Sequence, residues 1–214
     1  MTGWLDPAQR TIGDASGRLS GVVVGVVRDN RDPQGLGRVR VDVPWLGDGA
    51  VSGWARIAVP MAGRGRGMFT LPEVDDEVLL AFEHGDPSRP FVVGTLWNTS
   101  SPPPLDNGDG KNNLRAIVSR SGMRVTFDDT PGAERVDVAD ADGAYRVTID
   151  VANRTVVVAS DGDIELSAPQ GTISLDAREI KLHSSTTSEI VADAALDLKG
   201  LTVNVKGSPL VKIN

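Results

Sequence analysis

The chain has 214 residues, a net charge of −7 and no cysteine, which excludes disulfides and thiolate chemistry. Aromatic residues make up only 4% of it, while 24 Gly and 13 Pro exclude long helices and favour short strands joined by tight turns. The acidic charge counts against binding to a phosphate backbone.

Residues 1–19 are polar and rich in glycine, and we interpret them as an N-terminal arm. Trp4 and Leu5 are isolated apolar positions within it. No basic region followed by an apolar stretch is present, so we expect no secretion signal. Two alternatives stay open for the arm: a disordered terminus, or a segment that docks on a neighbouring protein.

Residues 20–98 are predicted to form a compact β-domain. Its expected strands cover residues 21–27, 38–46, 54–60, 77–83 and 90–97. In the second strand Val39, Val41 and Val43 alternate with Arg40 and Asp42, which is typical of a half-buried strand. About five strands in so short a stretch predict a small, partly closed barrel of the oligonucleotide/oligosaccharide-binding (OB) type.

Other notable residues of this domain are interpreted as structural rather than as parts of a catalytic or binding site. The glycine-rich residues 63–67 are expected to be a link, and Arg38 and Arg89 are expected to pair with Glu77 or Asp86. The aromatic residues lie in strand patterns, so we assign them to a core or an interface rather than to nucleic-acid binding: Trp45, Trp54, Phe69, Phe82, Phe91 and Trp97.

Residues 99–113 are predicted to be a linker, since three consecutive prolines stiffen them and Asn-Gly and Asp-Gly pairs supply turns. From residue 114 to residue 214 short apolar pairs recur, with turn residues between them. The pairs are Val125/Phe127, Val136/Val138, Val147/Ile149, Val156/Val158, Ile164/Leu166, Ile173/Leu175, Ile180/Leu182, Leu196/Leu198, Val203/Val205 and Val211/Ile213.

Each of these strands offers only two or three apolar side chains, and no long helix is available to cover them. A single chain would leave open strand edges and exposed apolar stripes. The chain either coils alone as a solenoid or winds together with two copies of itself. Because about ten strands make only three or four solenoid rungs, the repeat favours an intertwined trimer, with each chain giving one wall of a prism.

Several stretches resemble the phage baseplate assembly protein V and VgrG spike families. They are GVVVGVVRDNRDPQGLGRVRVDVPWL from residue 21, LPEVDDEV from residue 71, HGDPSRP from residue 84, SPPP from residue 101 and SGMRVTFDDTPGAE from residue 121. The resemblance covers residues 21–214. It implies an all-β chain with an N-terminal OB-fold barrel, followed by a C-terminal intertwined trimeric β-helix or β-prism.

The resemblance also implies partners. A separate ring-shaped hub protein would hold the barrel, because only about 20 residues precede it, and Trp4 and Leu5 are its expected contacts. A PAAR-type tip protein would cap the other end at residues Pro209, Leu210, Val211, Lys212, Ile213 and Asn214. Inner-tube and baseplate proteins, and a target membrane contacted mechanically, complete the set. The protein would be assembled in the bacterial cytoplasm, within a phage-tail-like particle, and leave the cell on firing.

The sequence indicates no catalytic, cofactor or metal site. The acidic residues between Asp128 and Asp142 lack the spacing of a calcium loop and are interpreted as solvated turns. The two histidines, His84 and His183, form no His-x-His pair, so the iron-binding tip of some short phage spikes is not expected. The sequence therefore predicts a structural spike rather than an enzyme. The alternatives are a carbohydrate-binding tail-fibre or adhesin-like protein, and a β-solenoid enzyme acting on polysaccharides.

Overall fold

The computed structural model describes residues 18–44 and 49–208, in two compact units, Met1–Asp163 and Ile164–Asn214. In these described ranges the regular elements are β-strands and a short 3-10 helix, η3 (Glu83–Gly85). No described helix is long and apolar enough to cross a membrane. The prediction of an all-β chain is thereby confirmed.

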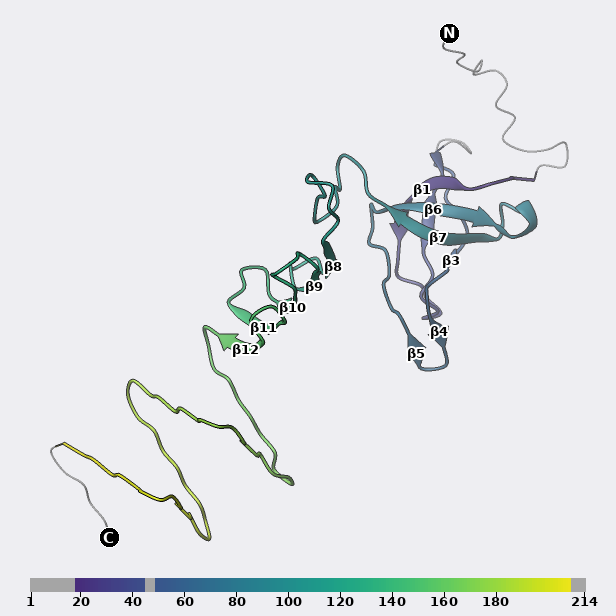
Figure 1. The fold of residues 1–214 in the computed structure, drawn as a ribbon. Helices are drawn as coiled ribbons and strands as arrows, with labels where there is room; N and C mark the ends of the chain where they lie inside the picture. Colours follow the sequence, from purple (N-terminus) through teal and green to yellow (C-terminus); the bar gives the residue numbers. More distant parts are fainter. Residues whose placement is uncertain (1–17, 45–48, 209–214) are drawn as a thin grey trace. The chain divides into compact units, whose positions relative to one another are not determined.

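The first sheet of unit 1 is a curled sheet of five strands in the order β2-β1-β6-β7-β3 (Figure 1). The strands are β1 (Val23–Asp29), β2 (Arg40–Asp42), β3 (Arg56–Ile57), β6 (Glu77–Phe82) and β7 (Pro90–Leu96). Two backbone hydrogen bonds between Val39 and Ala55 (3.0 and 2.7 Å) join the two ends of this order, because Ala55 directly precedes β3. The result is a small, partly closed barrel, as the sequence predicts.

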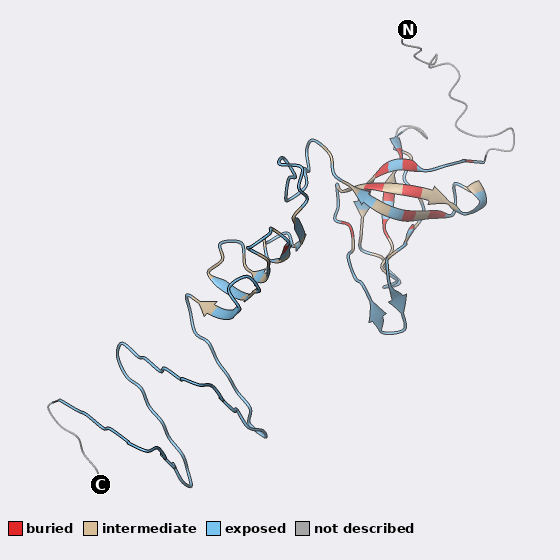
Figure 2. Cartoon of the chain, in the orientation of Figure 1, coloured by how far each residue is buried: buried red, intermediate tan, exposed pale blue. Residues whose placement is uncertain are grey.

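Buried residues gather on the strands of the barrel (Figure 2). Nearly all of these core residues are branched aliphatics. The alternation predicted at residues 39–43 is observed, since three valines are buried while Arg40 faces solvent. Phe82 is partly buried against the core. The core residues are Val23, Val27, Val39, Val41, Val43, Ala55, Val78, Leu80 and Val92.

The glycine-rich stretch at residues 63–67 is a β-hairpin, so its interpretation as a link was wrong. Strand β4 (Ala62–Gly63) pairs antiparallel with β5 (Arg66–Gly67), and residues 64 and 65 make the turn. Gly65 has a φ of 64°, which a two-residue hairpin turn requires. The hairpin extends beyond the five-stranded sheet (Figure 1).

The loop between β1 and β2 is organised by Asp32. Its carboxylate accepts hydrogen bonds from Arg38 Nε at 2.8 Å and from Arg38 Nη2 at 2.7 Å. Arg38 therefore pairs with Asp32 and not with Glu77 or Asp86. The expected pairing of Arg89 with Asp86 is confirmed at 3.8 Å, and Arg89 also pairs with Glu83 at the shorter distance of 3.1 Å.

A second sheet follows within unit 1, as an antiparallel meander in chain order (Figure 1). Its strands are β8 (Leu114–Val118), β9 (Arg124–Asp128), β10 (Arg135–Ala139), β11 (Tyr145–Asp150) and β12 (Thr155–Ser160). Four of the predicted apolar pairs lie in β9, β10, β11 and β12. The repeat identified in the sequence is therefore regular here, with one strand for each pair.

Residues 164–208, the described part of unit 2, adopt no strand. The backbone instead follows long extended runs joined by reversals (Figure 1). The backbone hydrogen bond found here is local, from Gly171 N to Ala168 O at 3.0 Å. Five further apolar pairs predicted from the sequence lie on these runs, but residues 164–208 form no strands with one another that would pair them.

Candidate assembly surfaces

The second sheet carries an apolar face that the chain leaves uncovered. Strand register places Phe127, Val136, Ile149 and Val156 opposite one another in one row across four strands. A second row lies two residues away on the same face. Its members are Ile117, Val125, Val138, Val147 and Val158. We call these nine side chains the apolar face.

Most of the apolar face is in contact with solvent. Val156 is 69% exposed, Ile117 is 64% exposed and Phe127 is 49% exposed. Full burial of one such side chain contributes about 1.5 to 3 kcal/mol relative to exposure. A contiguous apolar surface of this kind marks a protein interface.

The opposite face of the same sheet carries mostly polar side chains, several of which pair with one another. Arg135 lies 3.3 Å from Asp128 on the neighbouring strand and 2.9 Å from Asp137. Thr148 donates a hydrogen bond to Asp137 at 2.6 Å. Hydrogen bonds from Thr130 lower the pKa of the Asp128 carboxyl, so this buried acid stays ionised at neutral pH. The sheet therefore has one face suited to water and one suited to packing.

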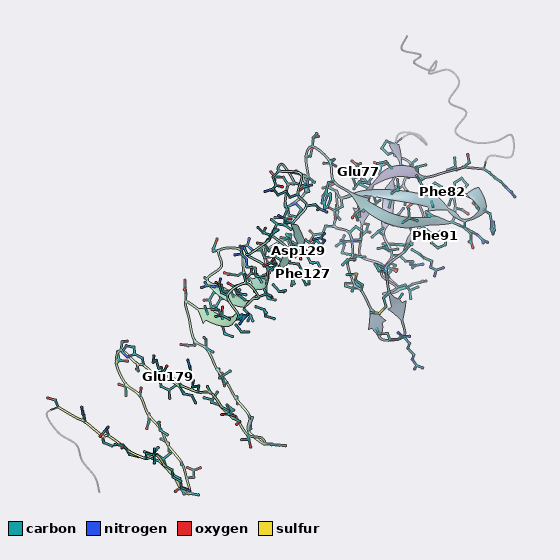
Figure 3. All side chains as sticks on the ribbon, viewed as in Figure 1. Glu77, Phe82, Phe91, Phe127, Asp129 and Glu179 are labelled. Carbon is teal, nitrogen blue, oxygen red and sulfur yellow. The ribbon has the colours of Figure 1, made fainter. Side chains whose placement is uncertain are left out.

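The described part of unit 2 extends the same pattern without any sheet. Its apolar pairs are exposed, with Leu182 at 81% and Leu166 at 72%. Along the run that carries Glu179, side chains project from an extended backbone without a neighbouring strand of the unit beside it (Figure 3). Both the backbone polar groups and the apolar side chains of these runs are thus available for pairing with another chain.

The end residues predicted as interfaces lie outside the described ranges. Trp4 and Leu5 precede residue 18, and the stretch Pro209–Asn214 follows residue 208. Trp45, assigned to a core or an interface, also falls outside. The hub and tip contacts stay predictions.

Asp129, Glu134 and Asp140 lie at turns, as predicted, whereas Asp128 ends β9 and is buried, so its interpretation as a solvated turn residue was wrong. Asp140 accepts a hydrogen bond from Tyr145 N at 3.1 Å, and Glu134 accepts one from Gly132 N at 3.0 Å. Asp129 pairs with Arg115 (Figure 3 labels Asp129). Among residues 18–44 and 49–208 no three acidic or histidine side chains are grouped as they would be around a metal ion.

The aromatic side chains of the barrel divide between packing and exposure. Trp54 lies under the Arg38 guanidinium at 5.9 Å, and Phe91 lies under that of Arg56 at 5.4 Å (Figure 3 labels Phe91). Phe69 is 82% exposed beside the β4–β5 hairpin and Trp97 is 71% exposed. The sequence pattern placed all of them in one group and did not single out Phe69 as part of a surface. The signal that would have found it is the absence of any acidic residue from position 49 to position 72.

Residues 23–97 match the family of type VI secretion system/phage-baseplate injector OB domains. The matched range begins at β1 and ends just after β7, so it coincides with the barrel. The OB domain predicted from the sequence is confirmed.

Curated relatives are named as spike proteins of type VI secretion. VgrG4b of Pseudomonas aeruginosa is 34% identical over 131 residues, covering 52% of this chain and 16% of the relative. VgrG3 of Vibrio cholerae is 27% identical over 128 residues, covering 56% of this chain and 13% of the relative. A third relative, from Vibrio cholerae, is named actin cross-linking toxin VgrG1. It is 29% identical over 108 residues, covering 47% of this chain and 10% of the relative. The chain thus spans less than a fifth of each of these relatives.

Proposed function

We propose that this VgrG-like chain, whose residues 23–97 belong to the injector OB-domain family, forms the homotrimeric spike of a contractile injection system. The observation that carries the proposal is the uncovered apolar face of the second sheet, on a chain whose barrel is a spike-family OB domain. Such a face needs a cover of the same apolar character. Two further copies of the chain supply it.

A trimer satisfies both halves of the C-terminal region. The sheets of three chains, each already hydrogen-bonded within its own chain, would form the walls of a triangular prism with the apolar faces inside. The runs of residues 164–208 would find backbone partners on the neighbouring copies and become strands of an intertwined β-helix. A closed three-chain structure leaves no lateral strand edge, which also protects it from aggregation.

The function that follows is mechanical. A shaft with a dry aliphatic interior and a continuous backbone ladder resists bending, so force applied at one end reaches the other. We propose that contraction of the injection machine drives this shaft through the envelope of a target cell. In this proposal the acidic residues cap turns and the chain performs no catalysis. That the relative VgrG1 is named a toxin concerns that much longer protein.

The remaining assignments complete the proposal. The arm at residues 1–19, with Trp4 and Leu5, contacts a separate ring-shaped hub protein, and the OB barrel of residues 20–98 sits on it. Residues 99–113 link the barrel to the spike of residues 114–214. Its last residues, Pro209–Asn214, hold a PAAR-type tip protein. Tube and baseplate proteins assemble with it in the bacterial cytoplasm, and the particle then acts outside the cell.

Deletion and rescue in the producing bacterium test the role in the particle. Cells lacking the gene should release no particles that penetrate target cells, and the full chain supplied in trans should restore them. Electron microscopy with an antibody against the barrel should label the tube end in the rescued particles. Particles that assemble and penetrate normally without the chain would refute the proposal.

A further inference from the structure

The OB domain contains a basic region within an acidic protein. Residues 49–72 include three arginines, Arg56, Arg64 and Arg66, and no Asp or Glu, although the whole chain has 29 acidic residues. Two of these arginines lie on the β4–β5 hairpin and the third lies on β3. The structure therefore gathers on neighbouring elements three arginines that the sequence spreads over residues 56–66.

The β4–β5 hairpin borders an open groove with an apolar floor. Arg56 and Arg66 line this groove, and Arg64 lies next to it in the hairpin turn. The groove has a volume of about 730 Å³ and lies between the hairpin, β3 and the loop at residues 35–37. Its larger apolar lining residues include Leu36, Ile57, Met61, Met68, Phe69 and Leu71. Phe69 and Leu36 are mostly exposed, at 82% and 66%. Methionine, phenylalanine and arginine together are the composition of a protein interface.

The three arginines in and beside the groove lack acidic partners among the described residues. In the described part of the chain, Arg56, Arg64 and Arg66 form no ion pair with a carboxylate. Elsewhere in the barrel Arg38 and Arg89 are both paired, with Asp32 and Glu83. Arg66 lies on β5 and lines the groove, and Arg64 lies in the adjoining turn, so their positive charge is available to whatever binds in the groove.

We propose that this groove is a docking site for an extended acidic segment of another protein of the particle, with apolar side chains interleaved with Asp or Glu. This inference rests on the proposed function, because it assigns the partner to the same injection particle. The apolar side chains would fill the groove, and the carboxylates would form charge-assisted hydrogen bonds with the arginine forks. An acidic segment is the favoured occupant because its negative charge complements the positive charge of these arginines.

Two other occupants fit the groove less well. A second copy of this chain docking by the same surface would bring three arginines against three arginines. A nucleic acid needs aromatic stacking platforms in a basic channel. Here Phe69 is flanked by methionine and aliphatic side chains, and the chain carries a net charge of −7. An acidic peptide segment meets both the apolar and the basic parts of the site.

The test uses photo-cross-linking in particles assembled by the producing bacterium, with p-benzoylphenylalanine replacing Phe69 in one strain. A second strain carries the same probe at Tyr145, which is 55% exposed and lies on the side of the second sheet that carries the apolar face. Mass spectrometry identifies the cross-linked peptides. We expect the Phe69 probe to join a peptide of another protein with carboxylates next to the attachment point, and the Tyr145 probe to join a second copy of this chain.

Charge reversal completes the test. The R64E/R66E double variant should lower the yield of the Phe69 cross-link about tenfold or more, because it removes the charge-assisted hydrogen bonds of Arg66 in the lining and reverses the charge beside the groove. The matched control R31E/R154E changes the net charge equally on exposed arginines outside the groove and should leave the yield unchanged. The Tyr145 cross-link should persist in both variants, which shows that the trimer still assembles.

The outcomes separate this inference from the proposed function. A Phe69 cross-link to this same chain, to nucleic acid or to a segment without carboxylates overturns the docking site, as does a yield insensitive to R64E/R66E. Absence of any Phe69 cross-link above background also overturns it. In each case a Tyr145 self-cross-link leaves the trimeric spike standing, whereas loss of the Tyr145 self-cross-link alone counts against the spike.

Discussion

Asp32 shows how one side chain fixes the loop that leads into the second barrel strand. Besides the two bonds from Arg38, its carboxylate accepts backbone hydrogen bonds from Gln34 N and Leu36 N, both at 3.0 Å. Its side chain is only 3% exposed. The hydrogen bond from Arg38 holds the pKa of this carboxyl well below its ordinary value. The loop is therefore stabilised only while Asp32 is ionised.

Replacement of Asp32 by Asn should destabilise the protein in a pH-dependent way. Because the pKa is lowered in the folded state, the stabilisation is complete above the unfolded-state pKa of about 3.9 and is lost as pH falls further, toward the lower folded-state value. Urea unfolding at fixed chain concentration should show a constant deficit for Asp32→Asn from neutral pH to about pH 5, shrinking below about pH 4. The control Asp106→Asn, an exposed turn residue, should show no deficit. A deficit that grows on acidification would contradict this role.

At position 25 on β1, steric contacts with the neighbouring strand leave no room for a side chain larger than that of glycine. A Cβ there would lie 2.5 Å from Val41 Cγ1 and 2.8 Å from the Asp42 carbonyl oxygen on the paired strand. Gly25→Ala should lower the free energy of unfolding by roughly 1 to 3 kcal/mol, as overpacking does. Gly94→Ala on β7 is the matched control, because nothing lies within 4 Å of the position its new methyl group would take, and its change should stay within about 0.5 kcal/mol. Equal effects of the two substitutions would show that steric space is not the cause.

At the scale of elements, the two faces of the β8–β12 sheet differ sharply although their residues alternate along each strand. On β12, Val157 pairs with Thr148 on the polar face, whereas Val158 pairs with Val147 on the apolar face. Substitutions at these two adjacent valines therefore test opposite faces of the same sheet. The difference between them isolates the contribution of the apolar face from any general effect of a new charge.

Val158→Asp should dissociate the trimer, while Val157→Asp should not. A carboxylate buried in the prism without a partner costs roughly 3 kcal/mol or more in each chain, whereas one on the polar face stays hydrated. Sedimentation velocity at several concentrations measures the shift from trimer to monomer. If both variants stay trimeric, or both dissociate, the apolar face is not the trimer contact.

Residues 164–208 should be ordered by association with other copies. Amide hydrogen exchange in the native trimer should show slow exchange there, because the amides donate to neighbouring chains. In dissociated Val158→Asp protein the same amides should exchange rapidly, while those of β1, β6 and β7 remain protected by the barrel. Fast exchange of residues 164–208 in a confirmed trimer would exclude them from the intertwined structure.

The elements differ in how far the sequence predicts them, for physical reasons. The strand around Val41 and the pairs from Val125 to Val158 were predictable, because burial on one face imposes a period of two. The β4–β5 hairpin was missed, since two-residue strands of Ala, Gly and Arg carry no periodicity. The pairing of Arg38 with Asp32 was missed because it depends on how a loop folds back over six residues.

At the scale of the whole chain, the sequence predicts more strands than the described residues form. The pairs after Ser160 follow the predicted pattern, but a strand needs a partner and no other described segment of the chain offers one. The pattern of side chains is encoded in one chain, whereas the hydrogen bonding of the proposed β-prism requires three. This is why the alternation was predictable while the prism itself stays a proposal.

The mass of the native particle formed by the purified full chain tests the central claim most directly. Native mass spectrometry should give three times the chain mass of 22.6 kDa, without lighter folded species at micromolar concentration. A stable folded monomer whose residues 164–208 are protected from exchange would contradict the account, because the chain would then cover its own apolar face.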